Sequence, residues 1–124
     1  MIHITEITGI KYEVDEATRK YVIRKIGGLE RYLPRHARKS ASADVKLKQI
    51  DKSHGNKYEV EVILNVPDKT LTAKDTAGNI LATVDIVEAK LAGQLRRYKI
   101  ETIPHLGRGR ILSRFKRSYA RESQ

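Results

Sequence analysis

Three segments of this chain alternate apolar with polar residues, and this alternation limits the folds open to it more than any other feature. They cover residues 43–48, 58–66 and 70–74. A period of two places the apolar side chains of a strand on one face. The stretches between them, 54–56 and 67–69, read His-Gly-Asn and Pro-Asp-Lys, which favour tight turns. The sequence therefore predicts three consecutive antiparallel strands with one buried face.

Two other segments carry apolar residues at spacings of three and four, the period of a helix with one buried stripe. The stripes are Thr18, Val22, Ile26, Leu29 and Leu33 in the first segment, and Val84, Val87, Leu91, Leu95 and Tyr98 in the second. They predict helices over residues 15–33 and 76–100. A side-chain oxygen at the first position can accept from free amides, so Asp15 is the expected cap of the first helix, and Asp75 or Thr76 of the second.

The remaining segments are shorter. Ile2 and Ile4 alternate with polar residues and predict a first strand, whereas residues 35–43 are basic and small and predict a surface loop. Gly27 and Gly28 fall inside the first predicted helix. Each costs about 1 kcal/mol relative to alanine there, which indicates a close backbone approach or a weak point.

The predicted order is β-α-β-β-β-α, an α+β fold. Because each strand has one apolar face and each helix one apolar stripe, two helices packed on one face of a four-stranded sheet are expected, with a groove between them. The outer face of the sheet would be solvated and of mixed charge. A chain of 124 residues suits one core. We expect a domain over residues 1–103 and a basic, flexible C-terminal tail over residues 104–124.

Charge points to the class of partner. The chain has 25 Lys and Arg against 15 Asp and Glu, a net charge of +10, which favours a phosphate-bearing partner. It has no cysteine, which fits the reducing cytoplasm. No run approaches the roughly 20 apolar residues of a membrane span, and a strand pattern stands where a secretory leader would. A soluble cytoplasmic protein with no membrane partner is expected.

Polar side chains beside the apolar stripes mark a candidate RNA-binding surface. Arg24 and Lys25 lie on the first predicted helix, and Lys90, Gln94 and Arg97 lie together on the second, so we expect both sets to flank the groove. Three tyrosines, Tyr32, Tyr58 and Tyr98, are interpreted as aromatic residues at the edge of the core rather than as stacking platforms.

The tail offers a second candidate RNA contact. Arg108 and Arg110 begin a run of six cations interleaved with Phe115 and Tyr119. Cations neutralise phosphates and aromatic rings stack on unpaired bases, which favours an RNA-binding extension over a solubilising one.

No pattern in the chain indicates catalysis. The four histidines have no metal-ligand spacing, and Glu59 and Glu61 are explained by strand alternation. No serine stands in a nucleophile turn, and no glycine-rich loop suits a phosphate. The sequence predicts no enzyme, metal site, cofactor or small-molecule substrate.

Four segments resemble a known family. The runs EVDEATRKYVIRKIGGLERYL, YEVEVILNV, TLTAKD and AKLAGQLRRYK are similar to those of the ribosome hibernation promoting factors, which include ribosome-associated inhibitor A. The most specific feature is KLxxQLRRYK at the end of the last helix. The resemblance implies a short member of the family that binds the 30S subunit and the 70S ribosome through ribosomal RNA. It would occupy the decoding region and block transfer RNA and messenger RNA.

The resemblance also implies individual contacts. Family positions that touch ribosomal RNA correspond to Lys25, Lys90, Gln94, Arg97 and Lys99. Charge and helical position add Arg24, Arg31 and Arg96, and the tail adds Arg108 and Arg110. The chain departs from the family in having Gly28 where a lysine is usual and Leu81 where a tyrosine is usual. A monomer is expected off the ribosome, because the apolar surfaces pair within the fold and like charges repel.

Two other functions remain open from the residues. A free-standing double-stranded RNA-binding domain also places two helices on one face of a sheet, although TAGNILATVD carries no cation where such domains usually do. An RNA-processing enzyme would need clustered acidic metal ligands, which the sequence does not supply.

Overall fold

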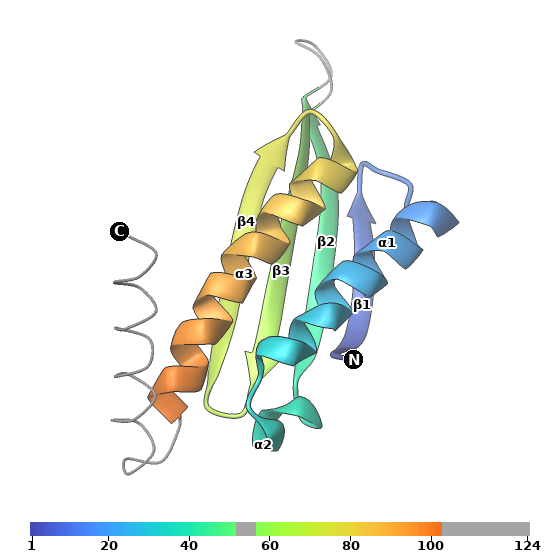
Figure 1. Ribbon diagram of the computed structural model, residues 1–124. Helices are drawn as coiled ribbons and strands as arrows, with labels where there is room; N and C mark the ends of the chain where they lie inside the picture. The colour runs from blue at the N-terminus through green and yellow to red at the C-terminus, as the bar shows by residue number, and fades with distance from the viewer. Residues whose placement is uncertain (52–56, 103–124) are drawn as a thin grey trace, which may run out of the picture.

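The computed structural model describes residues 1–51 and 57–102, which form a mixed sheet covered by helices (Figure 1). In chain order the elements are β1 (His3–Ile10), α1 (Glu16–Gly27), a 3-10 helix η1 (Gly28–Tyr32), α2 (Arg35–Arg38), β2 (Ser42–Asp51), β3 (Lys57–Val66), β4 (Lys69–Ala77) and α3 (Ile80–Thr102). The predicted α+β class and its order of four strands and two long helices are confirmed, and η1 and α2 are additions.

The strands follow one another across the sheet in the order β1-β2-β3-β4. β1 runs parallel to β2, while β2, β3 and β4 are antiparallel neighbours. A parallel pair needs a crossover, and the segment from α1 to α2 provides it. Figure 1 shows α1 and α3 side by side on the same face of the sheet, as predicted.

The core lies between that face and the two long helices. Every residue of both apolar stripes is buried, with Tyr98 only 1% and Thr18 only 5% exposed. Alternate strand residues meet them from the sheet, among them Val45, Val60 and Val62. The outer face carries the opposite set: Lys46 lies across from Glu61, with Nζ 3.9 Å from Oε1, and Lys48 lies across from Glu59. The mixed-charge outer face is confirmed.

The first predicted helix is not continuous. α1 ends at Gly27, and the backbone N–H of Gly28 donates to the carbonyls of Arg24 and Ile26, so the chain tightens into η1. The tighter turn still keeps Leu29 and Leu33 in the core. Gly27 is at a close approach, because Ile2 N donates to Gly27 O at 3.1 Å and an added Cβ would lie 2.6 Å from Met1 Cε. Gly28 has open space around it.

The predicted surface loop over residues 35–43 is wrong in two respects. Residues Arg35–Arg38 form a single helical turn, α2, and β2 has already begun at Ser42. Pro34 precedes the turn and its carbonyl accepts from Ala37 N at 3.0 Å. Ala37 is fully buried, so one small apolar residue anchors an otherwise basic segment.

The start of the last helix also differs from the prediction. β4 continues to Ala77, so Asp75 and Thr76 belong to a strand, and α3 begins at Ile80. Asn79 is the cap: its Oδ1 accepts from Leu81 N at 2.9 Å and from Ala82 N at 3.2 Å. The strand pairing of β3 with β4 overrides the local capping signal. None of the helices in the described residues could cross a membrane.

Candidate nucleic-acid interface

The contact between α1 and α3 is polar and holds the predicted contact residue Lys25. The Tyr21 hydroxyl donates to Asp85 Oδ1 at 2.6 Å, and Lys25 Nζ lies 3.5 Å from the same oxygen and 3.8 Å from Glu88 Oε1. Hydrogen bonding to Asp85 raises the pKa of the Tyr21 phenol. Lys25 Nζ and Arg24 Cζ also lie 5.8 and 5.2 Å from the Tyr21 ring centroid. This part of the groove is therefore largely neutralised by the two carboxylates of α3.

The predicted placement of Lys90 and Gln94 beside the groove is wrong. Lys90 Nζ lies 2.8 Å from Asp75 Oδ2 and donates to Lys74 O at 3.4 Å, and Gln94 Nε2 donates to Thr72 O at 3.0 Å. Both side chains lie against the edge strand β4. The Lys90 ammonium is the main reason that the pKa of Asp75 is lowered.

The cause is the rotation of α3 about its axis. A helix with one buried stripe has two flanks, and residues at spacings of three and four share a flank. Lys90, Gln94 and Arg97 share one flank, and Lys90 and Gln94 contact β4 from it. Asp85, Glu88 and Arg96 share the other, which contacts α1 and η1. Periodicity identifies the flanks but does not say which one faces the neighbouring helix.

Arg31 and Arg96, 65 positions apart in the chain, meet on one tyrosine. Arg31 Cζ lies 4.9 Å and Arg96 Cζ 5.1 Å from the centroid of the Tyr32 ring. The Arg31 guanidinium first, and that of Arg96 after it, lower the pKa of the Tyr32 phenol because both stabilise the phenolate. Tyr32 packs against the core as predicted, and its outer part also contacts two cations, which the sequence interpretation missed.

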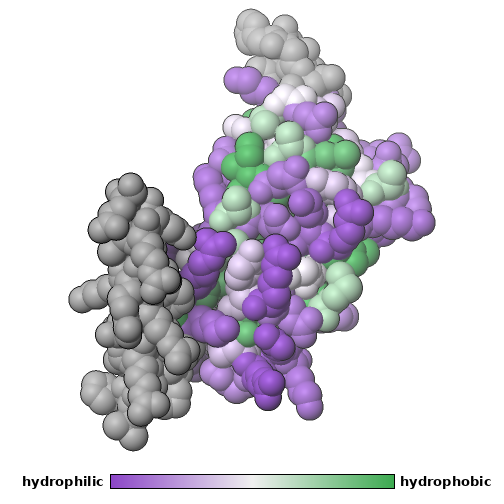
Figure 2. Space-filling model, viewed as in Figure 1, coloured by the Kyte–Doolittle hydropathy of each residue, from purple (hydrophilic) through white to green (hydrophobic). Residues whose placement is uncertain are grey.

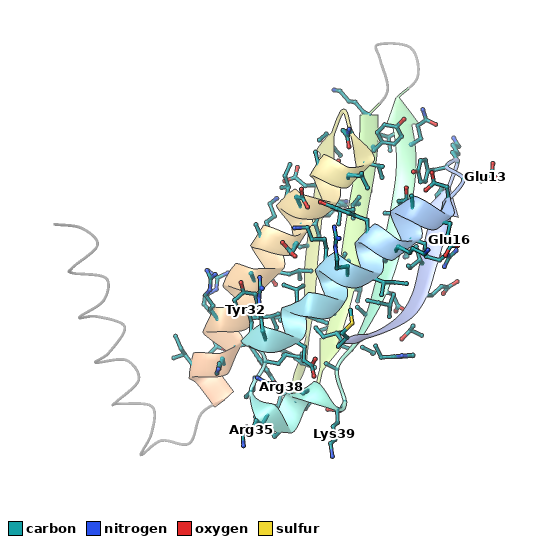
Figure 3. All side chains as sticks on the ribbon, turned by 45° about the vertical axis from the view of Figure 1, so that its right-hand side comes forward. Glu13, Glu16, Tyr32, Arg35, Arg38 and Lys39 are labelled. Carbon is teal, nitrogen blue, oxygen red and sulfur yellow. The ribbon has the colours of Figure 1, made fainter. Side chains whose placement is uncertain are left out.

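More cations lie at the same end of the molecule. Figure 3 shows Arg35, Arg38 and Lys39 around α2 close to Tyr32, whereas Glu13 and Glu16 lie at the opposite end of the helix layer. Arg38 Nε donates to Leu33 O at 3.3 Å, which holds its guanidinium over the turn. Charge and helical position did not predict these three residues as contacts. The basic run RHARK in the sequence could have indicated that they belong to the interface.

Arginines in the helix layer carry positive charge that no carboxylate of the described residues pairs with. We define the arginine surface as Arg24, Arg31, Arg35, Arg38, Arg96 and Arg97. Across residues 1–51 and 57–102, none of these six lies within 4.0 Å of a carboxylate, in contrast to Lys25, Lys46, Lys69 and Lys90. Figure 2 shows hydrophilic side chains spread over the helix layer. An exposed guanidinium without an acidic partner is suited to a phosphate oxygen.

The other predicted contacts divide into two groups. Lys99 is exposed near the end of α3. It shares the flank of Arg96, three residues earlier. Arg108 and Arg110 lie outside the described residues.

An open depression of about 380 Å³ lies between the starts of α1 and α3, lined in part by Tyr12, Thr18, Tyr58 and Leu81. Its only charged lining residue is Asp15, so it is a poor place for phosphate. In the part of the chain that the structure describes, no group of three His, Asp or Glu residues could hold a metal ion.

Comparison with known proteins assigns the chain to a family. A family model described as sigma 54 modulation protein / S30EA ribosomal protein matches residues 5–101. Ribosome hibernation promotion factor of Lactococcus lactis subsp. cremoris (strain MG1363) is 38% identical over 93 residues, 75% of this chain and 48% of that protein. The factor of the same name from Staphylococcus aureus (strain COL) is 34% identical over 94 residues, 76% of this chain and 47% of that protein. The chain thus spans about half the length of these relatives.

Solved structures show the same architecture. The N-terminal domain of Protein Y from Thermus thermophilus superposes with a TM-score of 0.68 at 24% identity, over 78% of this chain and 99% of that one. A ribosomal subunit interface protein from Coxiella burnetii superposes with a TM-score of 0.64 at 27% identity, over 79% and 98%. From residue 5 to residue 101, the chain belongs to the sigma 54 modulation protein / S30EA ribosomal protein family.

Proposed function

We propose that this chain binds the small ribosomal subunit through its helix layer and inhibits translation as a ribosome hibernation factor. The observation that carries the proposal is the arginine surface, whose cations come from α1, η1, α2 and α3 and have no acidic partner within the described residues. The names of the relatives, ribosome hibernation promotion factor and ribosomal subunit interface protein, indicate the ribosome as the source of phosphate.

The mechanism that we propose is steric. A compact domain bound over the decoding region of the 30S subunit would fill space that transfer RNA and messenger RNA need, without changing a covalent bond. Binding would rest on phosphate contacts, and its free energy would come largely from released counterions. Such a role places the protein in the cytoplasm with 30S and 70S particles.

The charged contacts would form in two ways. Arg24, Arg96 and Arg97 can meet phosphate directly, because they give up no ion pair with a carboxylate of residues 1–51 or 57–102. Lys25 and Lys90 would have to exchange a carboxylate partner for a phosphate, which is feasible because surface ion pairs contribute little free energy.

A double-stranded RNA-binding domain receives less support. The first turns of α3 present Asp85 and Glu88, and no cation precedes Lys90 in that helix. Carboxylates at this position would repel the backbone of an RNA duplex.

A pair of charge-matched variants tests the proposal by sedimentation with 30S subunits. One variant changes Arg24, Arg35 and Arg97 to Gln, and the control changes Lys46, Lys48 and Lys74 to Gln on the outer face of the sheet. Each lowers the net charge of +10 by three.

We expect the arginine variant to lose most of its binding and to inhibit a reconstituted translation reaction poorly. The salt dependence of its affinity should also flatten, by roughly 0.7 in log–log slope per lost phosphate contact. The control should bind within about threefold of the unmodified chain. Its three charges lie on the outer face of the sheet, and at physiological salt their effect on RNA at the helix layer is largely screened. Equal losses in both variants, or no sedimentation of the unmodified chain with 30S or 70S particles, would contradict the proposal.

A further inference from the structure

Two arginines from different elements lie on the ring of Tyr32. Arg31 comes from η1 and Arg96 from α3, and their Cζ atoms lie 4.9 and 5.1 Å from one ring centroid. The two guanidinium carbons are therefore at most about 10 Å apart and share one aromatic ring.

No carboxylate of the described residues pairs with either of these two cations. Neither Arg31 nor Arg96 forms an ion pair there, whereas Lys25 on the same helix layer has two carboxylate partners. Both arginines are exposed. A site that holds two cations together and leaves them unneutralised is complementary to an anion with several acceptor oxygens.

Tyr32 is what brings the two guanidinium groups together. Its ring is half-buried and packs against the core, so its position is set by the fold rather than by the arginines. The negative face of an aromatic ring attracts guanidinium groups within about 6 Å of its centroid. A guanidinium has five N–H donors, so one that lies at the ring of Tyr32 still has donors left for a ligand.

We propose that Arg31, Tyr32 and Arg96 form a phosphodiester-binding site for an RNA backbone. The arginines contact the phosphate oxygens, and Tyr32 is a positioning residue that holds both guanidinium groups in place before the RNA arrives. The site rests on the proposed function for the source of its RNA, but its chemistry requires only a single-stranded phosphodiester chain. It joins η1 to α3, so one bound backbone would contact both sides of the helix layer.

Variants at Tyr32 separate positioning from contact. Tyr32→Phe keeps the aromatic face, and Tyr32→Leu keeps an apolar residue but removes that face. We expect Tyr32→Phe to bind 30S subunits within about twofold of the unmodified chain, and Tyr32→Leu to bind about tenfold more weakly, because two cation–π contacts are lost.

Arginine variants test the pair directly and do not disturb the core, since both side chains are exposed. Arg31→Gln and Arg96→Gln should each weaken binding about tenfold, and the double variant should lose less than the product of the single losses, because the two residues share one ligand. Arg19→Gln, an exposed cation near the start of α1, is the charge-matched control and should change affinity less than about threefold.

A second measurement does not need the ribosome. The Nε–Hε signals of Arg31 and Arg96 are followed by NMR in the full chain while a short oligouridylate is added. We expect both signals to shift with one dissociation constant, to shift likewise in Tyr32→Phe, and to lose this common response in Tyr32→Leu.

The outcomes separate this site from the proposed function. If the NMR signals of Arg31 and Arg96 shift in a way that depends on Tyr32, but the chain does not bind 30S subunits, the site is supported and the ribosomal role is refuted. The site is overturned if Tyr32→Leu binds 30S subunits and oligouridylate as the unmodified chain does. It is equally overturned if the signals of Arg31 and Arg96 shift no more than that of Arg19. If Tyr32→Leu fails to fold, the two arginine variants and the NMR titration of the unmodified chain still test whether Arg31 and Arg96 contact one RNA ligand.

Discussion

At the scale of single residues, every ion pair between two side chains of the described residues uses lysine as its cation. Lys25, Lys46, Lys69 and Lys90 each lie within 4.0 Å of an Asp or Glu oxygen. The arginines of residues 1–51 and 57–102 instead lie on aromatic rings, as on Tyr21 and Tyr32, or have no carboxylate of the described residues within 4.0 Å. A guanidinium is planar and weakly hydrated, so it stacks and still donates in its plane. This division leaves the residue type best suited to phosphate exposed on the helix layer.

Gly28 gives a prediction that joins stability to binding. Its φ of −67° and ψ of −12° suit any residue, and no atom lies within 4 Å of an added Cβ. Gly28→Ala should therefore raise the free energy of unfolding by about 0.4–1 kcal/mol, because it restricts the unfolded chain. Gly28→Lys should also strengthen binding to 30S subunits, because it adds a cation to the helix layer. Chemical denaturation and sedimentation check the two effects, and a gain in stability without any gain in affinity would place Gly28 outside the interface.

Asp15 gives a prediction for pH. Its Oδ1 accepts from Thr18 N at 2.8 Å, and hydrogen bonding to Thr18 lowers the pKa of the carboxyl below its usual range. A carboxyl whose pKa is lower in the folded state stabilises the fold above its unfolded pKa of about 3.9. That contribution is lost as the pH falls through the lower folded value.

The matched variant for this effect is Asp15→Asn, which keeps a capping oxygen but does not titrate. Thermal unfolding should show the unmodified chain losing its advantage over Asp15→Asn below about pH 4. A difference in midpoint that stays constant from pH 7 to pH 3 would show that the cap does not depend on charge.

At the scale of elements, the polar contact between α1 and α3 limits the positive charge of the helix layer. Asp85 and Glu88 neutralise Lys25, and Asp85 also accepts from Tyr21. These carboxylates join the two helices but oppose an approaching phosphate.

Asp85→Asn with Glu88→Gln should therefore strengthen binding to 30S subunits about three- to tenfold at low salt, because Lys25 is released and two repulsive charges are removed. The control is Glu59→Gln with Glu61→Gln, which makes the same change in net charge on the outer face of the sheet. It should alter affinity little. If both pairs strengthen binding equally, the effect belongs to net charge and the α1–α3 contact has no special part in it.

The helices and strands also show how much of the fold and of the candidate site can be predicted from the sequence. The apolar stripes predict the buried residues of α1 and α3, because burial requires one continuous face and a period of 3.6 reports it. The change from α1 to η1 at Gly27 and the capping of α3 by Asn79 depend on backbone contacts with Ile2 and on the pairing of β4. The site is less predictable still. Arg31 and Arg96 were named from charge, but their meeting on Tyr32 depends on the rotation of α3, which periodicity leaves open.

At the scale of the whole molecule, positive charge is concentrated at the α2 end of the helix layer. The α2 end carries Arg35, Arg38 and Lys39, whereas at the opposite end of the helix layer Glu13 and Glu16 offset cations such as Arg19 (Figure 3). A charge asymmetry of this kind orients a protein in the field of a polyanion before contact and raises its rate of association. The outer face of the sheet, with Lys46 paired to Glu61, contributes little to this orientation.

The last prediction concerns residues 104–124, which lie outside the described residues and contain Arg108, Arg110, Phe115 and Tyr119. If this segment only improves solubility, its removal should leave binding to 30S subunits almost unchanged. If it is a second RNA contact, docking of the helix layer raises its effective concentration near ribosomal RNA, so weak contacts add to the total affinity. We expect a chain ending at Ile103 to bind at least about tenfold more weakly, which corresponds to about 1.4 kcal/mol.

Phe115→Ala with Tyr119→Ala keeps every cation and should reproduce part of the loss, because stacking on unpaired bases is removed. A truncated chain that inhibits translation as strongly as the full chain at the same salt concentration would leave the helix layer as the whole of the binding site.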